Sequence, residues 1–389
     1  MTTGRHEFAD RWQANAQLAW DTLAMKPTRG IGTWEFQTMQ WSQLEELSGN
    51  LPGSYPQEPV RVYREFMLKG GVSYLDQWIP ENPLSMKDQG YTADTARSAT
   101  GGAEAIVCDG MPIDSPEDVV AHMEKYLIPR WQHHLQAIEL DPDAVVRKLI
   151  DEELAVQRLF GPNMLKGPYV FSFPAFRYFE YGYQNYFMAY ALYPEIIERD
   201  FKLAADCSAA YNRCVARAIL EAGLPRMLRL DHDMADSRGM LVDVHSLDRI
   251  WFPHFVRAIQ PFFDADIRLI WHCDGNLMDM VPRLLEVGIS GFQGFQYEDG
   301  MDYPAICKMK DSAGNPLFII AGVSVTRTLP HGTAAAVRDE LRWLVENGPP
   351  VGLLLGCTSS ITPGVPLENL RALIDGFRYY REHGRQGIS

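Results

Sequence analysis

From Gly167 onward, short apolar segments alternate with segments that have the periodicity of amphipathic helices. The apolar segments are Pro168–Phe173, Met227–Leu230, Ile267–Trp271, Ile289–Phe295, Leu317–Gly322 and Gly352–Gly356. Each is nearly continuously apolar, as expected of parallel strands that are covered on both faces. Strand–helix units in succession, joined by short loops, favour a closed parallel barrel over an open sheet. No GxGxxG motif follows any of these segments, which argues against a dinucleotide-binding sheet.

The intervening segments carry helix start and stop signals. Thr333 is a suitable N-cap for a helix that ends before Gly348, and Gly384 closes the last predicted helix. Ser115, followed by a proline at the first helical position, opens a largely helical stretch that extends to Leu159. The sequence therefore predicts the α/β class, with a (β/α)8 TIM-type barrel as the architecture.

The first 110 residues lack this alternation and are rich in glycine, proline and aromatic residues. We interpret them as an N-terminal helical and irregular extension that wraps the barrel and supplies its early strands. The expected organisation is a single barrel domain over residues 1–389, with the clear strand–helix units at residues 167–384. A chain of 389 residues lies within the size range of decorated barrels of this kind.

Composition excludes several classes of protein. The formal net charge is −14, and no cluster of lysine and arginine offsets it, so a nucleic-acid partner is not expected. There is no apolar run long enough for a transmembrane helix and no apolar segment near the N-terminus typical of a signal peptide, so a cytoplasmic location away from membranes is expected. The six cysteines form no CxxC pair, which argues against a zinc ribbon or a disulfide scaffold.

Reactive groups in barrel enzymes follow the carboxyl ends of the strands. Here those positions carry carboxylates, imidazoles, amides and a thiol. They are Asp231, His232, Asp233, His272, Asp274, Gln293, Gln296, Glu298, Cys357 and Ser359. Any one of them could be a helix cap or a turn former. Helix caps and turns do not need imidazoles and a thiol at the same strand ends, so we expect the functional site at the carboxyl ends of these strands.

His272 and Asp274 form an HxD arrangement. Residues i and i+2 of an extended segment point the same way, so both side chains can reach one point, while Cys273 faces the opposite side. With Cys357 from a neighbouring loop they would form a three-ligand set with one open position, as at a catalytic zinc. The alternative is that His272 is a general acid or base held by Asp274 or Asp231.

Asp231 and Asp233 share a face if their strand continues, and two close carboxylates raise the pKa of one of them. Both are candidate catalytic residues. His232, which lies between them, is a weaker candidate because it points to the other side.

Longer stretches of the sequence are similar to a known family. They are WHCDGNLMDMVPRLLEVGISGFQGFQ (Trp271 to Gln296), GMDYPAIC, IAGVSVTRTLPHGTAAAVRDEL and ITPGVPLENLRALIDG (Ile361 to Gly376). Together they make the chain from Gly167 to Gly384 resemble the uroporphyrinogen decarboxylase superfamily, which includes cobalamin-dependent methyltransferases. The resemblance implies a (β/α)8 barrel with a cleft at the carboxyl ends of its strands. The arginine-rich N-terminal segment of uroporphyrinogen decarboxylases themselves is missing, which argues against their reaction.

The methyltransferase branch of this superfamily binds zinc through an HxC segment and a later cysteine. His272 matches the histidine, whereas Asp274 occupies the position of the first cysteine. Cys357 lies two residues before the position of the second, which Ser359 occupies. A His, Asp and Cys set would make a harder, more Lewis-acidic zinc ion than a thiolate-rich set.

The function implied by this branch is zinc-dependent transfer of a methyl group between a small methylated substrate and cobalamin on a separate corrinoid protein, because the chain lacks a DxHxxG cobalamin loop. Aromatic residues near the cleft could sandwich a methoxylated aromatic substrate. The expected substrate-binding residues are Trp78, Asp76, Tyr178, Gln296 and Glu298. Members of the superfamily often dimerise, so the resemblance leaves a homodimer open.

Two other functions remain open from the residues. One is a metal-independent decarboxylase or lyase of a small carboxylic acid, with Asp231, His272 and Asp274 as acid–base groups. The other is a binding protein without catalysis, which is disfavoured because so many polar groups at the rim would be costly to desolvate.

Overall fold

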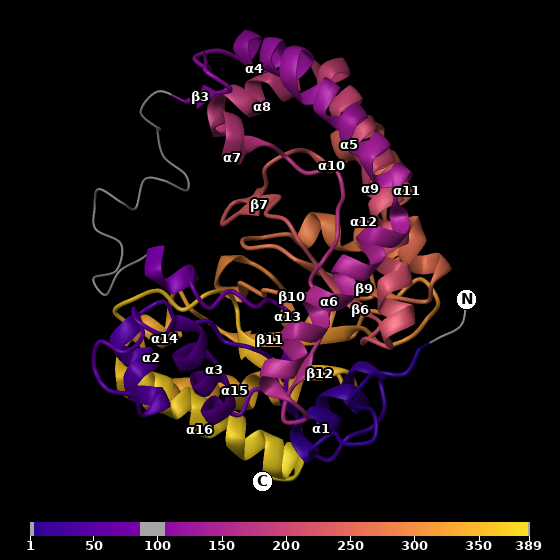
Figure 1. Cartoon of the computed structure of the whole chain (residues 1–389). Helices are drawn as coiled ribbons and strands as arrows, with labels where there is room; N and C mark the ends of the chain where they lie inside the picture. Colours follow the sequence, from indigo (N-terminus) through magenta and orange to yellow (C-terminus); the bar gives the residue numbers. More distant parts are fainter. Residues whose placement is uncertain (1–3, 86–105, 388–389) are drawn as a thin grey trace.

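The computed structural model describes residues 4–85 and 106–387. Its centre is a six-stranded sheet in which every neighbouring pair is parallel (Figure 1). The strand order is β1 (Gly32–Thr33), β12 (Leu353–Cys357), β11 (Phe318–Val323), β10 (Gly291–Gln293), β9 (Arg268–His272) and β6 (Met227–Asp231). The α/β class is thus confirmed, and the five later predicted strands are found within two residues of their expected bounds.

The row of parallel strands continues beyond β1. An isolated bridge between Trp34 and Tyr74 joins β1 to β2 (Tyr74–Leu75), and β2 pairs in parallel with β5 (Leu165–Lys166). In the described residues no ladder joins β5 to β6, so strand pairing alone does not establish the closed barrel that the sequence predicts.

The predicted strand at Pro168–Phe173 is wrong, because the chain leaves the sheet after Lys166 and has no regular structure there. Pro168 has no N–H group to donate to a ladder. Further along, the side chain of Asn212 replaces a neighbouring strand: its Oδ1 accepts from the Ser172 N–H at 3.0 Å, and its Nδ2 donates to the Ser172 carbonyl at 2.7 Å. The apolar run is thus held by a helix side chain.

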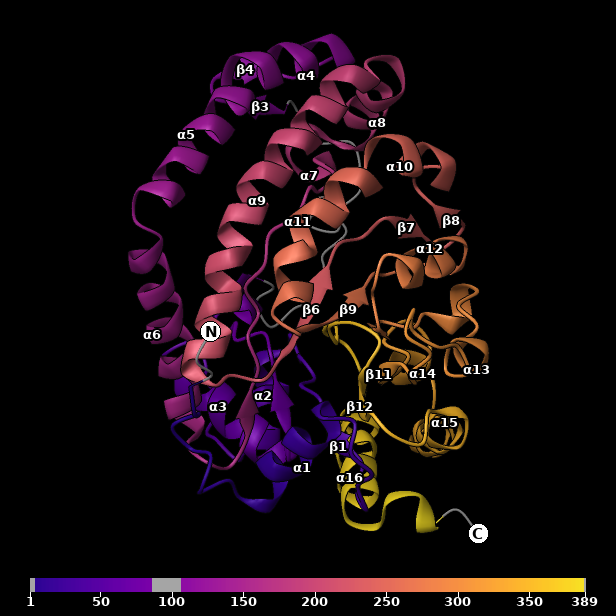
Figure 2. The same cartoon turned by 90° about the vertical axis from the view of Figure 1, so that its right-hand side faces the viewer.

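Helices cover the sheet and extend beyond it. They are α1 (Ala14–Leu23), α2 (Trp41–Ser48), α3 (Pro59–Gly70), α4 (Pro116–His122), α5 (Ile128–Leu140), α6 (Pro142–Phe160), α7 (Tyr178–Tyr181), α8 (Tyr183–Leu192), α9 (Pro194–Ala222), α10 (Val244–Ile250), α11 (Phe252–Asp264), α12 (Val281–Glu286), α13 (Tyr303–Ile306), α14 (Thr328–His331), α15 (Ala334–Asn347) and α16 (Leu367–His383). Two short antiparallel pairs lie outside the sheet, β3 (Val107–Cys108) with β4 (Met111–Pro112) and β7 (Ala235–Asp236) with β8 (Gly239–Met240). Figure 2 shows α9 and α11 side by side, with α5 along α9.

The predicted capping signals are confirmed. The Thr333 side chain accepts from the N–H of Ala336 at the start of α15, and Ser115 caps α4 in the same way. Gly384 follows α16 with a φ of 58°, a conformation that favours glycine. The main core lies between the sheet and the helices and includes the fully buried Trp251 and Trp271. Among the helices of the described residues, none is long and apolar enough to cross a membrane.

Candidate functional site

A cavity of about 210 Å³ lies at the carboxyl ends of the parallel strands. Its lining residues are Trp34, Gln37, Gln77, Arg229, Asp231, Asp233, His272, Asp274, Gln293, Ser359 and Ser360. Asp231, His272 and Gln293 are the last residues of β6, β9 and β10, so the strands themselves aim these side chains at one place. This is the edge at which parallel α/β folds bind their ligands.

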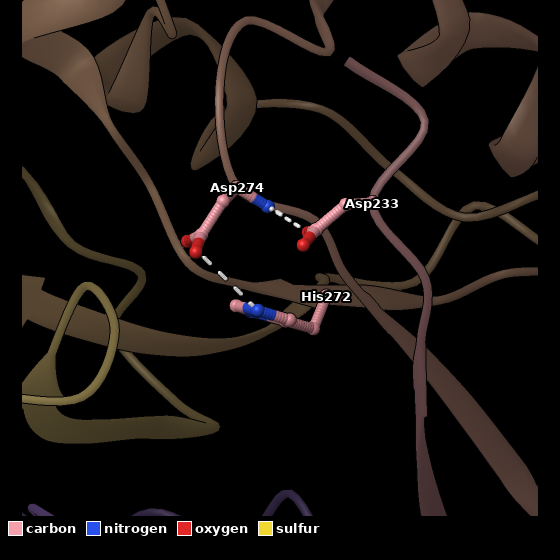
Figure 3. Close-up of side chains that lie close together, drawn as sticks. All are labelled: Asp233, His272 and Asp274. Carbon is pink, nitrogen blue, oxygen red and sulfur yellow. Dashed lines mark hydrogen bonds and ion pairs between the residues drawn. The ribbon is translucent and has the colours of Figure 1, made fainter. Parts of the chain in front are cut away.

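Asp233, His272 and Asp274 form a group that could hold a metal ion. One ligand atom from each lies within 4.8 Å of the others (Figure 3). His272 Nε2 is 3.9 Å from Asp274 Oδ1, and the Asp274 N–H donates to Asp233 Oδ1 at 2.8 Å. The sequence predicts that His272 and Asp274 converge, and they do; Asp233 completes the group in place of Cys357.

The donor atoms of this group fit a divalent cation. Asp274 Oδ1 is buried and accepts no hydrogen bond, so it is free to bind a ligand. An imidazole nitrogen with two carboxylates is a set that zinc accepts and that harder cations also accept. Cys273 turns away, as expected, and its buried thiol accepts from the Met234 N–H and donates to the Asp274 carbonyl.

The charges in the cavity shift the pKa values of its groups. Burial lowers the pKa of His272, but the negative charges of Asp231 and Asp274 outweigh burial and raise it above its ordinary value. Burial and the charge of Asp233 raise the pKa of Asp274 to about 6, although the charge of His272 opposes this. The site therefore holds a carboxyl and an imidazole whose pKa values are both raised above their ordinary values, as is common at functional sites.

Asp231 shows the opposite shift. Burial raises the pKa of its carboxyl, but the charges of His272 and Arg229 and a hydrogen bond from Tyr169 outweigh burial, so the pKa lies below its ordinary value. The Tyr169 hydroxyl donates to Asp231 Oδ2 at 2.8 Å. The neutral carboxylic acid that the sequence suggests at Asp231 or Asp233 is therefore not Asp231.

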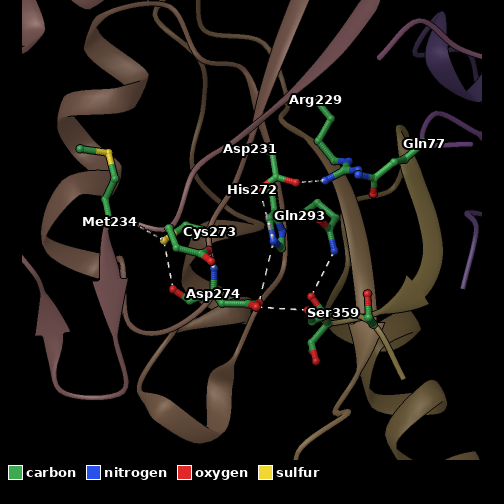
Figure 4. A network of polar contacts seen from close by, with 12 residues as sticks. Gln77, Arg229, Asp231, Met234, His272, Cys273, Asp274, Gln293 and Ser359 are labelled. Carbon is green, nitrogen blue, oxygen red and sulfur yellow. Dashed lines mark hydrogen bonds and ion pairs between the residues drawn. The ribbon is translucent and has the colours of Figure 1, made fainter. Parts of the chain in front are cut away.

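Arg229 is the main residue of the site that the sequence analysis missed. It is 2% exposed, and its guanidinium binds both oxygens of Asp76, at 2.9 and 3.2 Å. The guanidinium also binds Asp231 Oδ2 at 3.0 Å (Figure 4). Asp231 Oδ1 then lies 3.9 Å from His272 Nε2. An arginine within an otherwise apolar strand was the signal that could have revealed it, because a buried charge needs a partner.

His232, Tyr178 and Cys357 are candidate residues that lie outside the cavity lining. His232 is buried, its Nε2 accepts from the Phe176 N–H at 2.9 Å, and burial lowers its pKa to about 4, so it holds the irregular segment as a neutral ring. The Tyr178 hydroxyl donates to the Asp233 carbonyl at 2.9 Å. Cys357 is buried at the end of β12, and burial raises the pKa of its thiol.

The other expected substrate-binding residues make structural contacts. Asp76 pairs with the buried guanidinium of Arg229, and Trp78 packs edge-on against Phe160. The side chain of Gln296 accepts from the Gly275 N–H, while Glu298 accepts from the hydroxyls of Ser324 and Thr326. None of these four lines the cavity.

Comparison with solved structures finds a similar fold. The chain is similar to a methyltransferase from Methanosarcina mazei, with a TM-score of 0.55 and 16% identity over 95% of this chain and 99% of that one. It also matches a B12-independent methionine synthase from Shewanella sp. W3-18-1, solved in complex with selenomethionine, with a TM-score of 0.34 and 14% identity over 62% of this chain and 67% of that one. The first likeness shows a shared fold, and the second is too distant to support an argument. No family model matches the sequence, and no curated protein is similar to it.

Proposed function

We propose that this protein is a zinc-dependent methyltransferase that moves a methyl group between a small methylated substrate and a separate corrinoid protein. The observation that carries the proposal is the Asp233, His272 and Asp274 group, in which a buried carboxylate oxygen at the strand ends accepts no hydrogen bond. Support comes from the fold, which is similar to that of a methyltransferase, and from the sequence resemblance to the cobalamin-dependent branch.

The proposed ligands differ from the set expected from the sequence. Asp233 takes the place of Cys357, because its carboxylate lies with the other two ligands whereas the thiol is buried and its pKa is raised. Bound zinc would supply a Lewis acid that polarises the heteroatom carrying the methyl group. The carboxylates of Asp233 and Asp274 would balance its charge.

The remaining residues position this group. Arg229 and Tyr169 both bind Asp231 Oδ2, which keeps Asp231 ionised and its Oδ1 facing His272.

We propose a (β/α)8 barrel closed between β5 and β6 as the architecture. Two side-chain contacts across the gap between these strands support it. Arg229 of β6 binds Asp76, which follows β2, and Asp231 binds Tyr169, which follows β5.

A metal-independent decarboxylase or lyase is the second candidate. The observation that favours it is the acid–base pair, in which Asp274 has a pKa of about 6 and lies beside a histidine whose pKa is raised. Such a pair could exchange a proton with a carboxylic-acid substrate near neutral pH without a metal.

Methyl transfer to cobalamin separates the two candidates. The zinc-loaded protein is mixed with cob(I)alamin and 2-methoxyphenol, and formation of methylcobalamin is followed by its absorbance. We expect turnover that falls by roughly 100-fold or more in His272→Ala, because the Lewis acid loses a ligand. Cys357→Ala should retain turnover. No methylcobalamin formation by the zinc-loaded protein, together with release of CO2 from a small carboxylic acid that persists after chelation of the metal, would favour the decarboxylase.

A further inference from the structure

The cavity is small and polar. Its volume of about 210 Å³ is below the roughly 300–1,000 Å³ of pockets that hold drug-sized ligands. The wall beside the metal group consists of amides and hydroxyls, namely Gln37, Gln77, Gln293, Ser359 and Ser360. Trp34 contributes an aromatic ring, but the Arg229 guanidinium carbon lies 5.1 Å from the centre of that ring. An apolar aromatic ligand would therefore leave many polar groups of this wall without partners.

Gln293 is the residue of this wall that has a buried side-chain atom without a hydrogen-bond partner. It is 2% exposed, and its Nε2 donates to the carbonyls of Cys357 and Thr358 at 3.3 and 3.2 Å. These two bonds fix the orientation of the amide. Its Oε1 is buried and accepts no hydrogen bond.

The sheet directs Gln293 to the same side as His272. The two residues are register partners in the parallel pair β10 and β9, and residues opposite each other in a sheet project from the same face. Figure 4 shows Gln293 between His272 and Ser359. A substrate that reaches His272 thus also meets the Gln293 amide.

The other cavity glutamines have satisfied oxygens. The Ser360 hydroxyl donates to Gln37 Oε1 at 3.1 Å, and Gln37 Nε2 donates to Gln77 Oε1 at 3.1 Å. Their oxygens are thus satisfied, whereas Gln293 Oε1 is a buried acceptor without a partner, which is costly, and a donor on the occupant of the cavity would satisfy it.

We propose that the substrate is a small polar molecule whose O–H or N–H group donates to Gln293 Oε1, so a methoxylated ring without such a donor is rejected. That the same molecule carries the transferable methyl group rests on the proposed function. Sites built to bond a substrate hydroxyl discriminate strongly against analogues that lack it, since the acceptor is then left unpaired.

Matched probes test this inference. The probes are 2-methoxyphenol against 1,2-dimethoxybenzene, and 2-methoxyethanol against 1,2-dimethoxyethane, which differ only in a donor O–H or its methyl ether. Dissociation constants are measured by ligand-observed NMR on the whole protein. We expect the donor of each pair to bind at least about tenfold more tightly, and Gln293→Met to bring the members of each pair within about twofold of each other.

Gln43→Met is the matched control. Gln43 is also buried, also donates through Nε2 to a carbonyl, that of Val365, and also has an unpartnered oxygen, but it does not line the cavity. The Gln43→Met variant therefore shows how the same substitution affects the structure away from the cavity, and it should still bind the probe with a donor O–H more tightly. Equal binding of the two members of each pair, no binding of either donor, or a preference that survives in Gln293→Met would overturn the inference.

Zinc titration of the same samples separates this inference from the proposed function. A donor preference that depends on Gln293, without zinc binding or methyl transfer, would uphold the inference and remove the proposed function. Zinc binding and methyl transfer without a donor preference would do the reverse.

Discussion

Arg229 supplies the cavity with a buried positive charge that pairs with two aspartates, Asp76 and Asp231. A buried guanidinium is tolerated only when it is paired, and here Asp76 binds it through both oxygens while Asp231 takes a third N–H. Burial lowers the pKa of Arg229, but the charges of the two aspartates outweigh burial and raise it well above its ordinary value. The charges of His272 and Arg229 thus outweigh burial and keep the pKa of Asp231 below its ordinary value.

Asp76→Asn tests this dependence. The change leaves the buried guanidinium without its bidentate partner, so we expect the free energy of unfolding to fall by about 3–5 kcal/mol. Urea denaturation measures it. The control is Asp339→Asn, which breaks an exposed pair with Arg342 and should cost less than about 1 kcal/mol. Equal losses in the two variants would show that Arg229 does not depend on Asp76.

Among the elements, the turn after β10 restricts how His272 can be placed. Gly294 has a φ of 82°, and a Cβ added there would lie 2.5 Å from His272 Nδ1. Glycine thus serves two purposes at this position: it adopts a left-handed conformation and it leaves room for the imidazole.

Gly294→Ala should displace His272 and lower zinc affinity by about 10- to 100-fold, the range seen when the support of a ligand is disturbed. Isothermal titration with zinc measures the change. Gly314→Ala separates the clash from backbone strain, because Gly314 has the same φ of 82° and nothing within 4 Å of an added Cβ. If the two variants lose affinity equally, the contact with His272 is not what matters.

Local signals predicted what depends on local sequence. Continuous apolar runs located the five later strands, capping residues located α15 and α16, and the strand ends correctly placed Asp231, Asp233, His272 and Asp274 at one cavity. At these positions the strand itself decides where the side chains point.

Contacts between residues far apart in the sequence determine the features that the sequence analysis did not predict. Trp34 and Gln37 reach the cavity because β1 pairs with β12, more than 300 residues away, and no local pattern encodes that contact. The run at Pro168–Phe173 is apolar enough for a strand, but its backbone pairs with Asn212 of α9 instead. The sequence analysis predicts that Trp78 and Tyr178 bind the substrate. In the structure their rings pack against Phe160 and Phe187 instead.

On the scale of the whole molecule, one buried carboxyl links stability to pH. Glu340 of α15 accepts from the Ser324 N–H at 2.8 Å, and burial raises its pKa from 4.5 to about 7. The folded protein therefore holds this proton more tightly than the unfolded chain. The stabilisation from the bound proton is complete below about pH 4.5 and is lost as pH rises through about 7.

We expect Glu340→Gln to remove this loss, so the free energy of unfolding of the variant should decline less between pH 5 and pH 8, by on the order of 1–3 kcal/mol. Urea unfolding at a series of pH values gives the comparison. Glu346→Gln, on the exposed side of the same helix, should keep the wild-type pH dependence. An unchanged slope in Glu340→Gln would assign the pH dependence to other groups.

Anomalous diffraction at the zinc edge, on crystals of zinc-loaded protein, is the most direct test of the site. We expect stoichiometric zinc bound by Asp233, His272 and Asp274, lost in Asp274→Ala and retained in Cys357→Ala. Zinc bound through Cys357, or no zinc at the strand ends after loading, would contradict the assignment.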